Sequence, residues 1–353
     1  MVLKLNRRKF IWYSSATLGT SLLLKACANN STTTPTTTNT TTSNNQSFKI
    51  AIALPGIITD QAWNQSGYEG VNLAKEKLGA EVAYVENVTQ ADQAEVLTDF
   101  ARKGYNVVFA HGGQFDAAVE QVAKQFPNTF FVAVNGSIKG ENIAALRINH
   151  IQASYLCGII GASVTKTNKL AYIAGQEFEA TKQELRGFEL GAKSVNPNIT
   201  VTSTFTGDWS DVAKGKEATL ALISAGNDVI YQWLDTAAAA VLQTASDKGV
   251  FAFGNTKDQL DVAPKAVLTS AVKRLDLAIN YLADLGKQKQ LKGEIYSIGF
   301  EKPDILSLGK FGENVPADLQ AKVLTVQKEI VDNKITFAPC QEAGKNTLCV
   351  QKV

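Results

Sequence analysis

From residue 48 onward, short apolar runs of strand length alternate with amphipathic helical patterns. The strand-like runs are Phe48–Leu54, Val82–Val85, Val107–Ala110, Thr129–Val134, Ile143–Ile148, Leu170–Ala174, Thr200–Phe205, Asp228–Gln232, Val250–Phe253 and Val267–Thr269. The helical patterns between them include Gln93–Lys103, Ala117–Gln125, Lys182–Ser194, Val212–Ser224 and Ala237–Lys248. Continuous apolar strands separated by helices are typical of parallel sheets covered on both faces. The sequence therefore predicts an α/β fold.

The number of strands exceeds what one doubly wound sheet usually holds, and about 300 residues are too many for one typical core. We therefore expect two lobes, each a parallel sheet flanked by helices, with a hinged cleft between them. Val267–Leu291 follows a break at Pro264 and is interpreted as a return crossing. The expected boundaries are 48–149 and 267–291 for lobe I, and 150–266 and 292–353 for lobe II.

A polar loop, Thr59–Gly70, separates the first strand from the helical pattern Tyr68, Val71, Ala74 and Leu78. In an open α/β sheet, ligands bind at such strand-to-helix junctions, beside the positive end of a helix dipole. The loop supplies one large ring, Trp63, and hydrogen-bonding groups that include Asp60 and Asn64. These groups favour a flat, heteroatom-rich ligand. The alternative is an ordinary polar loop whose tryptophan covers the edge of the domain.

The first residues carry a twin arginine, Arg7-Arg8, followed by an uncharged segment, Ile11–Leu24. This segment is shorter than the roughly 20 apolar residues that span a bilayer, so we interpret residues 1–27 as a signal peptide. Cys27 follows a small residue, as in a bacterial lipobox, although Lys25 departs from that pattern. Lipidation of Cys27 would anchor the protein to a membrane. The alternative is an exported protein that is cut nearby without lipidation.

Residues 28–47 consist largely of Thr, Asn and Ser, with no side chains that could form a core. We therefore expect a disordered tether, and a glycosylated stalk is the alternative. Together with the signal peptide, the tether predicts an exported lipoprotein that faces the periplasm or the cell exterior.

Composition and isolated reactive residues exclude several function classes. The net charge of +2 is too small to indicate a basic surface for nucleic acids. The two histidines, His111 and His150, have no second metal ligand at a suitable spacing. Cys157 lies in an apolar helical run and is interpreted as a buried small residue, whereas Cys340 and Cys349 are expected to form a disulfide that closes a small terminal loop. No nucleophile–base set or phosphate loop is present, so we expect a protein that is not an enzyme and needs no cofactor or metal.

Six stretches together resemble the basic membrane protein family, whose members are lipoprotein substrate-binding components of ABC importers. These stretches are Asp60–Gly70, Ser154–Ala162, Arg186–Asn198, Asp211–Ala218, Gly226–Ile230 and Leu268–Arg274. The resemblance implies a type I periplasmic-binding-protein fold, a purine base or nucleoside as ligand, and ABC permease subunits as partners. Trp63 stands where the family commonly has a stacking Phe, Asn64 matches the Asn that follows it, and Lys273 matches a lysine that reaches the ligand.

Other candidate ligand contacts follow from this resemblance. The loop after the Val107–Ala110 strand contributes Gln114, Phe115 and Asp116, and Asp116 could accept hydrogen bonds from a purine edge. At Thr256 nucleoside-binding members usually carry an Asp that binds ribose hydroxyls, so the substitution leaves the ribose contact in doubt. Asp258 lies in the same loop as Thr256 and is a further candidate contact.

In the second half, strand-like patterns end in Phe178, in Asp208 and Trp209, and in Trp233 and Asp235. The Asp208-Trp209 and Gln232-Trp233 pairs resemble the base-binding branch of the family more than its nucleoside branch. The alternative for each tryptophan is edge packing between loop and helix. Two further functions also stay open: the same fold binding a flavin, thiamine or amide-type solute, and a ligand sensor for a membrane receptor.

Overall fold

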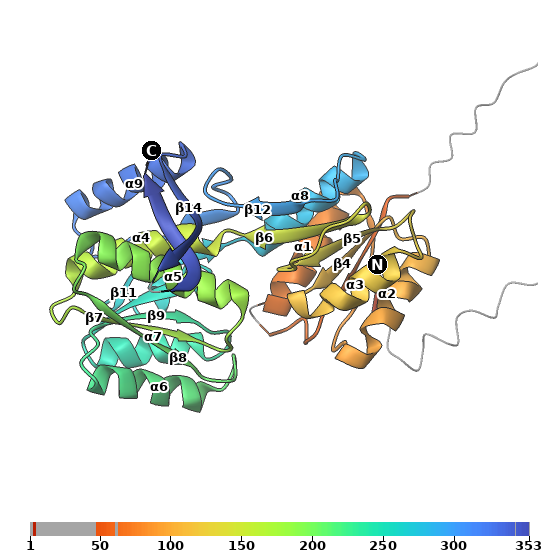
Figure 1. Cartoon of the computed structure of the whole chain (residues 1–353). Coiled ribbons are helices and arrows are strands. Elements are labelled where there is room, and N and C mark those ends of the chain that lie inside the picture. The colour runs from red at the N-terminus through yellow and green to blue at the C-terminus, as the bar shows by residue number, and fades with distance from the viewer. Residues whose placement is uncertain (1–2, 5–46, 61–62, 343, 353) are drawn as a thin grey trace, which may run out of the picture.

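Two sheets, each covered by helices on both faces, form the two lobes of the protein (Figure 1). The computed structural model describes residues 3–4, 47–60, 63–342 and 344–352. Cys27 and nearly all of the expected signal peptide and tether lie outside these residues. The α/β class and the two-lobed architecture predicted from the sequence are confirmed.

All neighbouring strands of the first sheet run parallel. In spatial order they are β1 (Leu3–Lys4), β3 (Glu81–Val85), β2 (Lys49–Ala53), β4 (Val107–His111), β5 (Phe130–Val134), β6 (Ile143–Ile148) and β12 (Ile295–Ile298). The second sheet is parallel except for its edge strand β13. Its order is β13 (Leu306–Leu308), β11 (Val267–Lys273), β10 (Phe251–Thr256), β9 (Val229–Trp233), β7 (Lys169–Ala174) and β8 (Thr200–Phe205).

Helices cover both faces of each sheet because alternate strand residues point to opposite sides. In the first lobe the helices are α1 (Trp63–Leu78), α2 (Gln93–Arg102), α3 (Asp116–Ala123) and α8 (Leu275–Lys287). Ile50 and Ile52 of β2 belong to the apolar cluster that includes α1 and α8, whereas Ala51 and Ala53 belong to the cluster with α2 and α3. In the second lobe the helices are α4 (His150–Val164), α5 (Glu179–Val195), α6 (Val212–Ser224), α7 (Ala238–Asp247) and α9 (Ala317–Val331).

Helices α4 and α5 pack backbone against backbone. A side chain in place of Gly158 or Gly191 would collide with backbone atoms of the opposite helix. Cys157 on α4 is fully buried, and this burial raises the pKa of its thiol, as expected for a packed small residue rather than a nucleophile. Because the two helices approach so closely, the first turns of α5 lie near the start of α4, where the chain enters the second lobe.

The chain crosses between the lobes three times, at Asn149, at Arg274, and between β12 and β13. The expected boundaries are therefore corrected for two strands. Residues 267–273 form β11, which pairs with β10 in the second sheet, and β12 pairs with β6 in the first sheet. Pro264 lies in the loop before β11 rather than at a crossing, and the apolar run after it does not reveal which sheet it joins.

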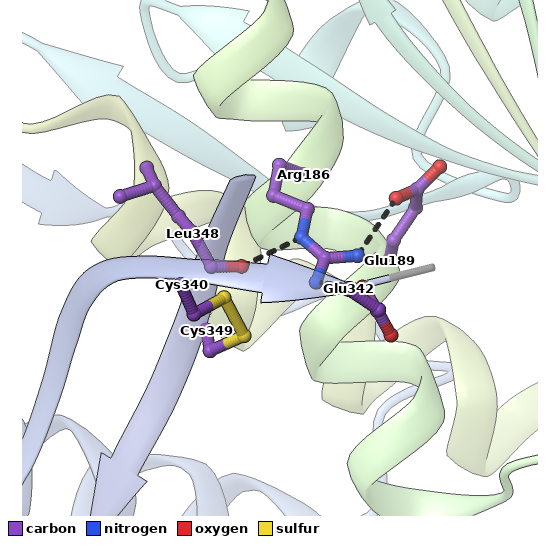
Figure 2. Close-up of a disulfide and its surroundings, with 6 residues drawn as sticks. All are labelled: Arg186, Glu189, Cys340, Glu342, Leu348 and Cys349. Carbon is purple, nitrogen blue, oxygen red and sulfur yellow. Dashed lines mark hydrogen bonds and ion pairs between the residues drawn. A yellow bond between two sulfur atoms is a disulfide. The ribbon is translucent and has the colours of Figure 1, made fainter. Parts of the chain in front are cut away.

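The chain ends in an antiparallel hairpin, β14 (Ile335–Glu342) and β15 (Lys345–Lys352), which lies beside α4 and α5 of the second lobe (Figure 1). Cys340 and Cys349 form the expected disulfide, which joins the two strands of the hairpin and closes the short segment between them (Figure 2). Arg186 on α5 donates to the carbonyl of Leu348 at 2.8 Å and pairs with Glu342. Phe337 adds an edge contact with Tyr155, at 5.3 Å between ring centroids.

We predict that the double variant Cys340→Ser/Cys349→Ser loses at most about 3 kcal/mol of unfolding free energy, because the bridge closes only a short loop. The contacts of Arg186 remain in the variant and hold the hairpin on α5. Urea unfolding of the variant, compared with the wild type with and without reductant, measures this loss. A larger loss, or free-thiol labelling of both cysteines in the native wild type, contradicts this assignment.

Candidate functional site

The carboxyl ends of the strands in both sheets face a cleft between the lobes, which is where open α/β sheets bind ligands. A central cavity of about 650 Å³ is lined from both lobes, by residues that include Trp63, Asn64, Gln114, Asp116, Asn135, Gln176, Phe178, Trp209, Trp233 and Asp235. An outer cavity of about 600 Å³ adjoins it and includes Asp60 and Asp208. An inner cavity of about 20 Å³ lies toward the crossings and includes His150, Thr256 and Lys273.

Trp63 forms the aromatic wall of the first lobe at the start of α1. Its ring stacks on His111 at the end of β4, with centroids 4.3 Å apart, and the His111 Nε2 lies 2.9 Å from the Trp63 carbonyl oxygen. Burial lowers the pKa of His111 to about 4, so the ring is neutral at physiological pH. A neutral, fully buried histidine is a fixed support behind the tryptophan.

Asp60 and Asn64 hold the loop that carries Trp63. Asp60 accepts hydrogen bonds from the backbone N–H groups of Asn64 and Gln65, at 2.8 and 2.9 Å, and from the Asn64 side chain at 2.7 Å. The side-chain amide oxygen of Asn64 (Oδ1) accepts from the Gly56 N–H at 3.0 Å. Both side chains line the cleft, but these contacts make them positioning residues for the loop and the start of α1.

The second lobe presents a row of rings opposite Trp63. Trp233 ends β9 and meets Trp209 edge to face, with centroids 6.2 Å apart. Phe178 stacks on Trp209 at 6.3 Å and is 55% exposed at the mouth of the cleft. His150 contacts the other side of Trp233, at 4.7 Å between centroids. The row provides apolar faces from the mouth of the cleft to its floor.

Two carboxyl groups lie in the central cavity with unused acceptor capacity. One oxygen of Asp116 accepts from the Ser137 N–H at 2.7 Å, and the other is buried without a partner among the described residues. Burial raises the pKa of Asp116. Burial, and secondarily the charge of Asp60, raises the pKa of Asp235 to about 7.

A buried polar cluster forms the floor of the cleft, beside two of the crossings. Glu184 on α5 pairs with Lys273 at the end of β11 and accepts a hydrogen bond from the Asn255 side chain. The Lys273 ammonium also lies 3.7 Å from the ring centroid of Trp233. Burial lowers the pKa of Lys273, while the charge of Glu184 opposes that effect. We name Glu184, Lys273, Asn255 and His150 the hinge cluster.

His150 completes the hinge cluster from the first turn of α4. Its Nδ1 lies 3.6 Å from the Glu184 carboxylate, and neither ring nitrogen has a hydrogen-bond partner among the described residues. Burial, followed by the charge of Lys273, lowers the pKa of His150 well below its usual range. His150 is therefore neutral at physiological pH and adds no charge to the cleft.

Two candidate residues lie outside the cleft, and each of the other twelve lines at least one of its three cavities. Phe115 is fully buried in the core between the first sheet and helices α2 and α3, because its side chain points away from the loop surface on which Gln114 lies. Asp258 accepts from the Lys310 N–H at 3.1 Å and lies 3.4 Å from the Ser270 hydroxyl, so it ties two loops together.

Sequence reasoning missed Asn135, which lines the central cavity, and the roles of His111, His150 and Glu184. Both histidines lie within two residues of the end of a strand pattern that reaches the cleft, and this position is the signal in the sequence that points to them. Within the described ranges no group of three or more His, Cys, Asp or Glu side chains is arranged to hold a metal ion. Nor does any helix of this part of the chain have the length and apolarity needed to span a bilayer.

The comparisons with known proteins agree with this geometry. Residues 47–339 match the model of a family described as ABC transporter substrate-binding protein, PnrA-like, which confirms the resemblance drawn from the sequence motifs. A solute-binding protein of an ABC transporter system from Aeropyrum pernix K1 superposes with a TM-score of 0.73 at 18% identity, covering 84% of this chain and 94% of that one. The type I periplasmic-binding-protein fold is thereby confirmed.

Three relatives carry different functional names. A purine-binding protein of Brucella abortus is 32% identical over 64% of this chain and 65% of its own length. An ABC transporter nucleoside-binding protein of Lactococcus lactis is 28% identical over 79% of this chain and 85% of its own. The transcriptional activator protein med of Bacillus subtilis is 27% identical, with coverage of 79% and 87%.

We predict that Glu184→Gln lowers the unfolding free energy by about 3 to 5 kcal/mol, because it leaves the ammonium of Lys273 buried without a counter-charge. Adding Lys273→Met should recover part of this loss. The matched control is Lys328→Gln, which breaks the exposed pair with Asp332 and should cost at most about 1 kcal/mol. Urea unfolding measures all three, and a Glu184→Gln loss as small as that of the control contradicts the role of the hinge cluster.

Proposed function

The chain belongs to the PnrA-like family of ABC transporter substrate-binding proteins, and from that premise we propose that it captures a purine base by closure of its two lobes. In this proposal the closed form delivers the base to the permease subunits of an ABC importer. The observation that carries it is the facing arrangement of Trp63 and the row of Trp233, Trp209 and Phe178 across the central cavity. Aromatic faces on both walls favour a flat ring system held between them.

The size of the central cavity supports a ligand of this kind. Its volume of about 650 Å³ falls within the range of roughly 300 to 1,000 Å³ that is usual for small-molecule sites. Polar groups from both lobes, among them Gln114, Asp116 and Gln176, lie around the rings and can satisfy ring nitrogens and exocyclic groups. A flavin, thiamine or amide-type solute offers part of the same chemistry and is the alternative ligand class.

Thr256 favours a free base over its nucleoside. The residue carries no charge, and its hydroxyl already lies within hydrogen-bond distance of the Asn255 side chain, at 3.3 Å. Its φ of 67° is unusual for a β-branched residue, and such strain is often retained at functional sites. A threonine here accepts a ribose hydroxyl less strongly than the carboxylate usual in nucleoside binders.

A sensor is the second candidate function, favoured by the relative named as a transcriptional activator. The same clamp would then present its closed form to a different partner. Ligand capture is common to both functions, so the two differ only in what binds the closed form. Genes for permease subunits beside the gene for this chain support transport, and their absence together with a neighbouring receptor gene supports sensing.

We predict that Trp63→Ala weakens the binding of adenine or guanine by ten- to a hundred-fold, about 1.4 to 2.8 kcal/mol. Trp63→Phe is the matched control and should keep most of the affinity, because it retains a stacking ring. Calorimetry with both bases and both nucleosides measures this on all three proteins, and circular dichroism checks that the variants fold.

Two results of that experiment contradict different parts of the proposal. Nucleosides that bind far better than bases overturn the argument from Thr256 but leave the purine site intact. No binding of any purine, together with a Trp63→Ala variant indistinguishable from wild type for the ligand that co-purifies, removes the purine proposal.

We also propose that Cys27, outside the described residues, is lipidated and anchors the exported protein. We predict that the wild type partitions with membranes, whereas Cys27→Ser is soluble or retained as precursor, because several acyl chains anchor stably and one does not. Membrane fractionation and mass spectrometry of the mature N-terminus measure this. A soluble wild type whose N-terminus lies away from Cys27 refutes the anchor.

A further inference from the structure

Asp235 occupies a singular position in the cleft. It follows β9 directly after Trp233 and Leu234, and it lines the central, outer and inner cavities alike. The backbone around it is fixed, because its N–H donates to the Trp209 carbonyl at 2.9 Å and its carbonyl accepts from the Ala238 N–H at 3.0 Å. The backbone of Asp235 is therefore fixed where the three cavities meet.

Among the residues that the structure describes, the carboxyl group of Asp235 stands apart from the other acidic groups of the cleft. Asp235 makes no side-chain hydrogen bond or ion pair with any of the described residues, whereas the oxygens of Asp60 accept from the start of α1 and one oxygen of Asp116 accepts from Ser137. A carboxylate oxygen that loses contact with water without gaining a hydrogen bond raises the free energy of the site. Both oxygens of Asp235 are therefore available to donors on a ligand that enters the cleft.

The charges that face Asp235 from the surrounding elements do not neutralise it. Asp60 lies across the cleft and Asp208 lines the outer cavity, and both have the same sign as Asp235. Lys273 shares the inner cavity, but its ammonium is paired with Glu184. His150, in the same cavity, is neutral. The surroundings therefore favour a ligand that brings N–H donors and disfavour an anionic one.

We propose that Asp235 is the specificity-determining residue of the cleft and that it selects a heterocycle with two adjacent N–H donors on one edge. The two oxygens of a carboxylate match such an edge with two parallel hydrogen bonds. Among purine bases guanine offers this edge, through its ring N–H and the neighbouring amino group. Hypoxanthine lacks the amino group, and adenine presents an acceptor beside its amino group. This inference rests on the proposed purine site.

The titration of Asp235 makes the affinity for guanine depend on pH. Its pKa of about 7 in the free protein means that the group is largely protonated below that pH. Two donors on the ligand bind only the ionised form, so they lower the pKa in the complex. By linkage, affinity for guanine is fully present above about pH 7 and falls as the pH decreases, by up to tenfold per pH unit.

The test measures base binding to the full chain between about pH 5 and pH 8, where none of the three bases itself gains or loses a proton. Quenching of tryptophan fluorescence needs little base and reports on the cleft directly, because three tryptophans line it. We expect guanine to bind at least tenfold more tightly than hypoxanthine or adenine at pH 8, with an affinity that falls below pH 7. Asp235→Asn should abolish both the preference and the pH dependence.

Two variants separate this effect from others. Glu177→Gln removes one negative charge near the mouth of the cleft but lines none of the three cavities, and it should leave the pH dependence intact. A pH dependence that survives Asp235→Asn but disappears in Asp116→Asn overturns the proposal and assigns selection to Asp116. Purines that bind equally well at every pH overturn it as well, whereas no purine binding at all contradicts the proposed function instead.

Discussion

The buried ion pair between Glu184 and Lys273 is the interaction on which the shape of the cleft depends. It ties α5 to the end of β11, one residue before the chain returns to the first lobe, and His150 stands one residue after the chain first leaves that lobe. Buried charges tolerate little misplacement, because the cost of desolvation is offset only when the geometry is good. The Glu184–Lys273 pair therefore fixes the floor of the cleft. The two walls of the cleft belong to separate lobes.

The two walls use different means to hold their aromatic rings. In the first lobe Trp63 stands alone, supported by a neutral histidine and by a loop that Asp60 and Asn64 tie to the start of α1. In the second lobe the rings support one another in a row that ends at an exposed phenylalanine. The cleft therefore has an isolated ring on one wall and an extended row of rings on the other.

Periodicity predicted the architecture because buried strands and amphipathic helices leave strong local patterns. Periodicity could not assign β11 and β12 to the correct sheet, because a buried strand has the same apolar pattern in either lobe. Strand ends and the family resemblance predicted twelve candidates that line the cleft, whereas Phe115 and Asp258 lie outside its cavities, because proximity to a strand end does not determine where a side chain points. The burial of Glu184 could not be predicted, because a glutamate on an amphipathic helix has the same sequence pattern whether it is solvated or buried.

The pairing of β12 with β6 joins residues 295–298 to residues 145–148. A first lobe that forms before the C-terminal segments therefore keeps an uncovered strand edge at β6, because β12 follows every strand of the second sheet except β13 in the chain. Contacts so distant along the chain slow folding and lengthen the time for which apolar surface is exposed. The unpaired edge of β6 is therefore the part of the first lobe that is exposed for longest while the chain folds.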